Sequence, residues 1–104
     1  MEVSTYPTEE GYIVDVKGDL TADQRLAILP ATVERVLSEK SPAAVAVRVR
    51  DVEVADLEGI AVLVHAWKAV TDRGVRFALI DGKPRVRRRL EQTGLLHLLE
   101  HGNL

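Results

Sequence analysis

The sequence predicts an α/β fold, a single domain whose mixed, mostly parallel sheet of four to five strands has helices packed against it in β-β-α-β-α-β-α order. Three observations support this prediction. The length of 104 residues suits one domain with one core. Runs rich in β-branched residues alternate with segments whose apolar residues recur every three to four positions. Glycine or proline stands at most of the joints between these segments.

The first two strands are expected to form an antiparallel hairpin. Residues 12–16 are rich in β-forming side chains and lie between Gly11 and Gly18. Residues 3–6 could pair with them as a short edge strand, with Pro7 in the turn. The chain then continues into the first helix.

That helix is expected to begin near Thr21, because residues 21–24 resemble a capping box in which Thr21 and Gln24 satisfy each other's backbone amides. Pro30 lies inside the predicted helix, where it removes one hydrogen bond and crowds the preceding turn. A kink and a short break are both compatible with it. One apolar stripe faces the core: Leu26, Leu29, Val33, Val36 and Leu37.

The second half of the chain continues the alternation. Residues 43–49 form a predicted strand in which every second residue is valine. A helix over 57–73 and a strand over 75–80 follow, separated by Gly74. Pro84 then fits the first turn of a helix that stops at Gly94, and residues 95–100 could add one or two further turns.

Composition excludes several classes of function. The chain has no cysteine, which removes disulfides, thiolate catalysis and zinc–thiolate sites. The formal net charge is -2, so no global attraction to nucleic acid or anionic lipid is expected. The N-terminus lacks an export signal, and the longest apolar stretch, residues 59–70, is too short and too interrupted to span a bilayer. A cytoplasmic protein without membrane insertion or direct nucleic-acid binding is expected.

No set of residues argues for catalysis or for a cofactor. None of the serines or histidines lies in a nucleophile motif, so the chain is not expected to be an enzyme. His97 and His101 are four residues apart, a spacing that can place two metal ligands on one helix face. No third ligand is evident, so two exposed histidines are the preferred interpretation and no metal site is expected.

A basic cluster over residues 83–89 allows two interpretations. As the start of a helix it would turn Val86 and Leu90 inward and leave most of its arginines in solvent. Interleaved aromatic residues that could stack on bases are absent. Positive charge at a helix N-terminus opposes the helix dipole, which favours an anionic ligand or an acidic partner. A solvated face is the preferred interpretation.

The helix after Gly59 is apolar nearly all round, so it is either plain core or partly exposed for a partner, and both alternatives stay open. Asp56 is a natural N-cap for this helix. Glu58 adds a carboxylate where the helix dipole favours negative charge. The same geometry suits an anion or phosphate.

The chain resembles a STAS domain, the fold of bacterial anti-sigma-factor antagonists. Four segments carry the resemblance in the right order: residues 18–20, 47–63, 73–80 and 84–95. In that family a strand leads into an Asp-Ser-Ser-Gly-Leu segment at a helix start, and a "Pro-x-Val-x-x-x-Leu" helix and a "Thr-Gly-Leu" follow. This chain has Asp56, Leu57, Glu58, Gly59 and Ile60 at the first of these motifs.

The resemblance implies partner switching without a cofactor. In such antagonists the unmodified domain binds an anti-sigma factor, often a serine kinase, and phosphorylation of the second serine disrupts binding. The implied partner-binding residues are those around the missing phosphosite and upstream of it: Asp56, Leu57, Glu58, Gly59, Ile60, Val62, Trp67, Asp19 and Thr21. The implied partner is an anti-sigma factor or a serine kinase of the anti-sigma type, and a homodimer is left open.

Departures from the family pattern bear on regulation. The two serines are Leu57 and Glu58, so phosphotransfer to these positions is impossible. Glu58 could act as a constitutive phosphomimic, and Arg48, which stands where the family often has Asp, could pair with it. The final strand and helix of longer members are missing or reduced to residues 101–104.

Three alternatives to this switch remain. The domain could be a scaffold subunit of a stress-signalling or lipid-transport assembly, in which case the helix over residues 60–70 would be left exposed in the isolated protein. It could keep Glu58 only as a helix-start carboxylate in a domain that has lost switching. A nucleotide sensor ranks last, because no glycine-rich phosphate loop is present.

Overall fold

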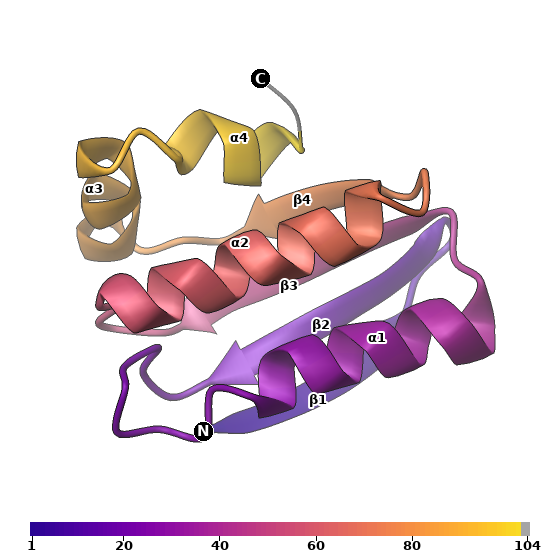
Figure 1. Cartoon of the computed structure of the whole chain (residues 1–104), viewed down its shortest axis with the longest axis horizontal. Helices are drawn as coiled ribbons and strands as arrows, with labels where there is room; N and C mark the ends of the chain where they lie inside the picture. Colours follow the sequence, from indigo (N-terminus) through magenta and orange to yellow (C-terminus); the bar gives the residue numbers. More distant parts are fainter. Residues whose placement is uncertain (103–104) are drawn as a thin grey trace.

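The computed structural model describes residues 1–102, and within them it forms one four-stranded sheet and four helices (Figure 1). In chain order these are β1 (Glu2–Pro7), β2 (Gly11–Lys17), α1 (Ile28–Lys40), β3 (Ala44–Asp51), α2 (Leu57–Thr71), β4 (Arg76–Ile80), α3 (Pro84–Gln92) and α4 (Leu96–His101). The predicted α/β class and element order are confirmed, and residues 95–100 supply most of α4. The proposed reduction of the last elements falls partly on residues 103–104, outside the described residues.

The sheet has the order β1-β2-β3-β4. β1 pairs antiparallel with β2, and β2 with β3 and β3 with β4 pair in parallel. The predicted hairpin followed by parallel crossovers is therefore correct. In Figure 1 the helices α1 and α2 lie in front of the sheet, while α4 lies beside β4.

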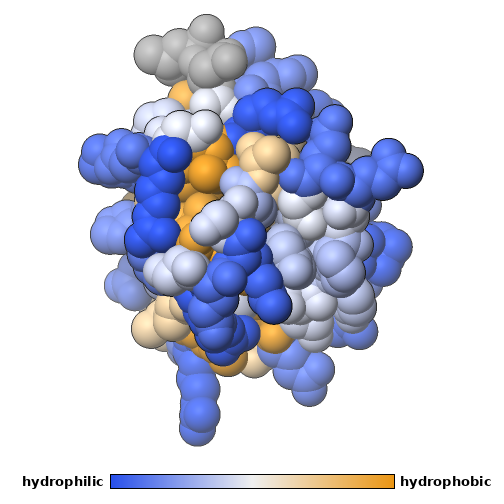
Figure 2. Space-filling model, turned by 90° about the vertical axis from the view of Figure 1, so that its right-hand side faces the viewer, coloured by the Kyte–Doolittle hydropathy of each residue, from blue (hydrophilic) through white to orange (hydrophobic). Residues whose placement is uncertain are grey.

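The core lies between the sheet and these helices. It contains the alternate side chains of the central strands, among them Val14 and Val16 of β2 and Val45, Val47 and Val49 of β3. Burial of one face of each strand follows from the period-two pattern read in the sequence. On the face shown in Figure 2, hydrophobic side chains form a narrow strip and smaller areas near the lower edge and the top, and hydrophilic side chains cover most of the rest.

The predicted start of the first helix is wrong. Residues 21–24 form a turn in which the Gln24 amide donates to the Thr21 carbonyl at 2.9 Å, and α1 begins at Ile28 after Ala27 without a side-chain cap. Pro30 therefore occupies the first turn of α1. Because first-turn amides have no partner within the helix, proline costs no hydrogen bond there, and neither a kink nor a break is needed.

Helix α2 packs one face into the core and leaves another face open to solvent, with Leu57, Glu58, Ala61, His65 and Lys68 exposed. Its buried residues, including Leu63, Ala66 and Val70, pack into the core. Trp67 is half-buried, and its indole Nε1 donates to the Gly102 carbonyl at 2.9 Å, directly after α4. Packing accounts for the buried apolar residues of the helix, and the apolar residues on its open face leave the alternative of a partner surface in place.

Candidate functional site

The first turn of α2 is held by Asp56, as the sequence predicted. Its backbone is extended, and its side-chain Oδ1 accepts a hydrogen bond from the Gly59 amide at 2.9 Å. The second oxygen, Oδ2, accepts from the Ala22 amide at 2.9 Å. Hydrogen bonds from Gly59 and then Ala22 hold the pKa of Asp56 below its ordinary value. One carboxylate thus joins the helix start to the loop after β2.

That loop is attached to the same place by its backbone. The Leu20 amide donates to the Val54 carbonyl at 2.9 Å, and the Leu20 carbonyl accepts from the Asp56 amide at 3.0 Å. Asp19 adds a side-chain contact, because its Oδ1 lies 3.2 Å from the amides of both Glu53 and Val54. The structure therefore brings the residues around Asp19 and Asp56, distant in sequence, into one rigid junction.

Gly59 is fixed by close packing at this junction. A Cβ atom at position 59 would lie 1.9 Å from the Leu20 carbonyl oxygen, far inside van der Waals contact. The residue is buried in a regular helical turn, so glycine is needed for space. Gly59 lets the helix approach the loop after β2. Because it is buried and has no side chain, it does not contribute a contact to a partner.

The two side chains between Asp56 and Gly59 point into solvent. Leu57 is 66% exposed, the highest fraction for any large hydrophobic side chain among residues 1–102, and Glu58 is exposed beside it. No ion pair among the described residues includes Glu58. The junction therefore presents an apolar side chain and a carboxylate together on a fixed helix end.

A groove of about 410 Å³ runs from Glu58 between the beginnings of α1 and α2. Most of its lining is apolar, and it consists of Leu26, Ala27, Pro30, Glu58, Ala61, Val62 and His65. Val62 thus lies on this surface as expected. Leu26, Ala27 and Pro30 were not singled out as surface residues, because the sequence pattern had placed them within a longer helix.

Three further residues of the predicted set lie outside this groove. Ile60 is only 3% exposed and belongs to the core. Trp67 lies two turns further along α2 and contacts the region after α4. The Thr21 hydroxyl donates to Asp23 Oδ1 at 2.5 Å in the loop after β2. Of the predicted set, Leu57 and Glu58 are exposed next to the junction, and Thr21 and Val62 are half-buried beside it.

The suggested pairing of Arg48 with Glu58 is wrong. Arg48 Nε donates instead to Asp15 Oδ1 at 2.8 Å, across neighbouring positions of β2 and β3. This hydrogen bond raises the pKa of Arg48 above its ordinary value. Asp15 is 1% exposed, and the Arg48 guanidinium also lies 5.7 Å from the centre of the Tyr6 ring. Period-two alternation between Val14 and Val16 was the signal that could have placed Asp15 on the face opposite the core.

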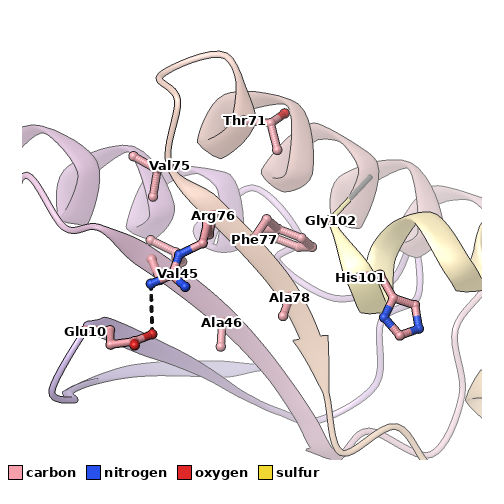
Figure 3. Close-up of a pocket in the computed structure, with 11 residues that line it drawn as sticks. Glu10, Val45, Ala46, Thr71, Val75, Arg76, Phe77, Ala78, His101 and Gly102 are labelled. Carbon is pink, nitrogen blue, oxygen red and sulfur yellow. Dashed lines mark hydrogen bonds and ion pairs between the residues drawn. The ribbon is translucent and has the colours of Figure 1, made fainter. Parts of the chain in front are cut away.

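A pocket of about 470 Å³ lies away from this site, over the beginnings of β3 and β4 (Figure 3). Ala46 and Ala78 line it from adjacent strands, and His101 lines it from α4. Glu10 and Arg76 at its edge pair with each other at 2.8 Å. The pocket contains no nucleophile beside a base, so it does not form a catalytic arrangement.

The two histidines of α4 have their ring centroids 4.6 Å apart, and both are exposed. Among residues 1–102, no group of three His, Cys, Asp or Glu side chains could hold a metal ion. Within the same residues, no helix combines the length and the apolar character that crossing a membrane requires.

Comparison with known proteins identifies the fold. The family model of the STAS domain matches residues 3–103. Among solved structures, a serine-to-glutamate variant of RsbS from Moorella thermoacetica is similar with a TM-score of 0.75 and 20% identity, covering 91% of this chain and 80% of that one. Unphosphorylated SpoIIAA, an anti-sigma factor antagonist, has a TM-score of 0.75, 14% identity and coverages of 91% and 83%.

A third similar structure is an anti-sigma factor antagonist from Mycobacterium paratuberculosis, with a TM-score of 0.75, 20% identity and coverages of 90% and 78%. At these identities the likeness concerns the fold. No curated protein matches the chain in sequence.

Proposed function

We propose, from the premise that this chain belongs to the STAS domain family, that it is a non-enzymatic regulator that binds an anti-sigma factor or a serine kinase of the anti-sigma type. It does so through the surface at the start of α2, which we call the α2 start: Leu57, Glu58 and the groove that begins there. Two of the proteins of similar fold are anti-sigma factor antagonists, which supports this class of partner.

The observation that carries the proposal is the exposure of Leu57 at a rigid helix end. An exposed leucine costs solubility and contributes nothing to a core, whereas a partner that covers it gains roughly 1.5–3 kcal/mol. The neighbouring groove continues this apolar surface toward Val62. Asp56 and Gly59 hold the presenting turn in place, so little conformational freedom is lost on binding.

Glu58 sets the regulatory state in this proposal. Glutamate carries about one negative charge, whereas phosphoserine carries about -1.5 to -2 with three acceptor oxygens, so the mimicry of phosphorylation is partial. Glu58 is exposed in the first turn of α2, where the helix dipole favours negative charge in the free domain. A partner that covers the position must desolvate that charge, and the bound state is therefore weakened.

Isothermal titration calorimetry of the domain against candidate anti-sigma kinases tests the proposal. Glu58→Ser should bind at least one candidate more tightly than the wild type, and Glu58→Gln, which keeps the size and removes the charge, should reproduce most of the gain. If both variants bind every candidate with unchanged affinity, the proposal that Glu58 acts as a phosphomimic is refuted. Mass spectrometry after incubation with kinase and ATP then shows whether the new serine is phosphorylated.

A second pair of variants tests the surface separately from its charge. Leu57→Lys should abolish binding, because it places a charge where the partner buries an apolar side chain. Ala43→Lys is the matched control, because Ala43 is exposed just before β3, at the opposite end of that strand from the start of α2. If Leu57→Lys and Ala43→Lys bind the partner with equal affinity, the α2 start is not the binding surface.

The scaffold alternative is separated by the same measurements. A scaffold without switching predicts that Leu57→Lys disrupts assembly while Glu58→Ser has no effect. Within the helix over residues 60–70, Ile60, Leu63 and Val70 are buried in the single chain, so an isolated scaffold would expose only the face with Ala61, His65 and Lys68.

A further inference from the structure

Helix α3 presents three arginines along one face. Arg85, Arg88 and Arg89 lie at positions i, i+3 and i+4, and Gln92 extends the row by one turn. All four line one pocket of about 280 Å³, whose remaining lining is Val54 and Ala55. Figure 1 shows α3 at the end of the molecule where α2 begins. We call this row the α3 arginine row.

The other cations of the helix are already paired. Arg87 makes two hydrogen bonds to Glu100, from Nε at 2.7 Å and from Nη2 at 2.9 Å, which join α3 to α4. Lys83 pairs with Glu53 in the loop before α2. These contacts fix α3 on two sides. The hydrogen bonds and ion pairs found among residues 1–102 include none from the side chains of the arginine row.

This arrangement is electrostatically unfavourable in the free domain. The first turn of α3 contains no acidic residue, and its N-terminus carries the partial positive charge of the helix dipole. Placing guanidinium groups at i, i+3 and i+4 adds mutual repulsion. An anion in the pocket would relieve both effects, and guanidinium groups bind carboxylate and phosphate oxygens in pairs.

The spacing of the arginine row is compatible with an extended peptide. Arg85 and Arg89 are separated by about 6 Å along the helix axis, at a rise of 1.5 Å per residue. In an extended peptide, alternate side chains on one face are separated by nearly 7 Å. Nucleic acid fits less well, because the pocket has no aromatic side chain for base stacking and the chain has a net charge of -2.

We propose that the α3 arginine row binds an extended acidic peptide segment of a protein partner, with carboxylates at alternate positions and small apolar side chains against Val54 and Ala55. The inference rests on the proposed function in so far as the domain is a protein-binding module. It adds a second contact on the other side of the loop that leads into α2. Its test needs no knowledge of the partner.

The probe is a fluorescein-labelled ten-residue peptide of alternating glutamate and alanine, with binding measured by fluorescence anisotropy at low salt. Arg85→Gln and Arg88→Gln together should weaken its affinity on the order of tenfold. Both positions are exposed, and glutamine keeps helix propensity. Arg35→Gln together with Lys40→Gln, at two exposed positions of α1, removes the same number of charges and should have little effect as the control.

Three results would overturn the inference. They are the absence of binding at millimolar protein, an equal effect of the control substitution, and equal binding of a peptide with glutamine in place of glutamate. Tighter binding of a single-stranded oligonucleotide with the same dependence on Arg85 and Arg88 would assign the row to nucleic acid instead. Glu58→Ser should leave the peptide affinity unchanged, so failure of the regulatory proposal is distinguishable from failure of this one.

Discussion

Replacing Gly59 with alanine tests the packing that holds the α2 start. In an unconstrained helix interior this substitution stabilises by about 1 kcal/mol. Here the new Cβ would lie 1.9 Å from the Leu20 carbonyl oxygen and 2.6 Å from its carbon. That carbonyl cannot swing away freely, because its oxygen accepts the Asp56 amide at 3.0 Å and the Leu20 amide donates to Val54.

The sizes of the competing free-energy terms decide whether Gly59→Ala stabilises or destabilises the fold. Overpacking a fixed site costs about 1–3 kcal/mol. If the Leu20 carbonyl moves, loss of its hydrogen bond to Asp56 adds about 1 kcal/mol. Set against a propensity gain of about 1 kcal/mol, the net destabilisation is about 1–3 kcal/mol. For a domain of this size each kcal/mol lowers Tm by about 4–8 °C.

Urea denaturation followed by circular dichroism gives the free energy of unfolding. Ala61→Gly is the matched control, because Ala61 is exposed in the same helix and loses only about 1 kcal/mol of helix propensity. Both Gly59→Ala and Ala61→Gly should therefore lower the free energy of unfolding. Helix propensity alone predicts that these two opposite substitutions have opposite effects. A Gly59→Ala variant as stable as the wild type, or more stable, would refute the packing argument.

Two further predictions concern charged groups of the fold. The pKa of Asp56 is lowered in the folded state, so its carboxylate stabilises the fold above the unfolded-state pKa of about 3.9, and this contribution is lost as the pH falls through the lower folded-state pKa. The stability advantage of the wild type over Asp56→Asn should disappear in acid; a difference independent of pH would contradict this. Arg48→Met should unfold at a lower temperature than the double variant Asp15→Val/Arg48→Met, because the single substitution leaves a buried carboxylate unpaired. The opposite order would show that Asp15 tolerates the loss of its partner.

The sequence was sufficient for the elements whose signals are local. The valine alternation of β3, the Asp56 cap and the glycine after α3 each specify a local conformation, and each lies where it was predicted. The start of α1 was predicted wrongly because it depends on a contact between residues that are far apart in the sequence. The residues from Thr21 to Gln24 have capping-box identities, but the Gln24 side chain accepts from the N-terminal amine at 2.9 Å, a contact of long sequence separation.

The candidate site was predictable in position but not in detail. Motif order located Leu57 and Glu58 at a helix start. Which of their neighbours face solvent depends on how α2 rotates against the sheet and α1. Periodicity placed Ile60 on the apolar stripe of core packing, where it is buried, and the partner-binding role that the resemblance implied for Ile60 was the weaker guide. The pairing of Arg48 with Asp15 depends on strand register, which a single sequence specifies only through the turn and the buried face.

At the α2 start, the fold constrains some positions and leaves the side chain at position 58 free to vary. Positions 56 and 59 are constrained, one by two hydrogen bonds and the other by contact with the Leu20 carbonyl. Position 58 lies between them with its side chain in solvent, so serine, phosphoserine or glutamate can occupy it without rearranging the core. Under the proposed function, a single substitution there changes how the domain is switched while the surface of the α2 start persists. The fold at this site therefore depends on the contacts of positions 56 and 59 and not on the side chain at position 58.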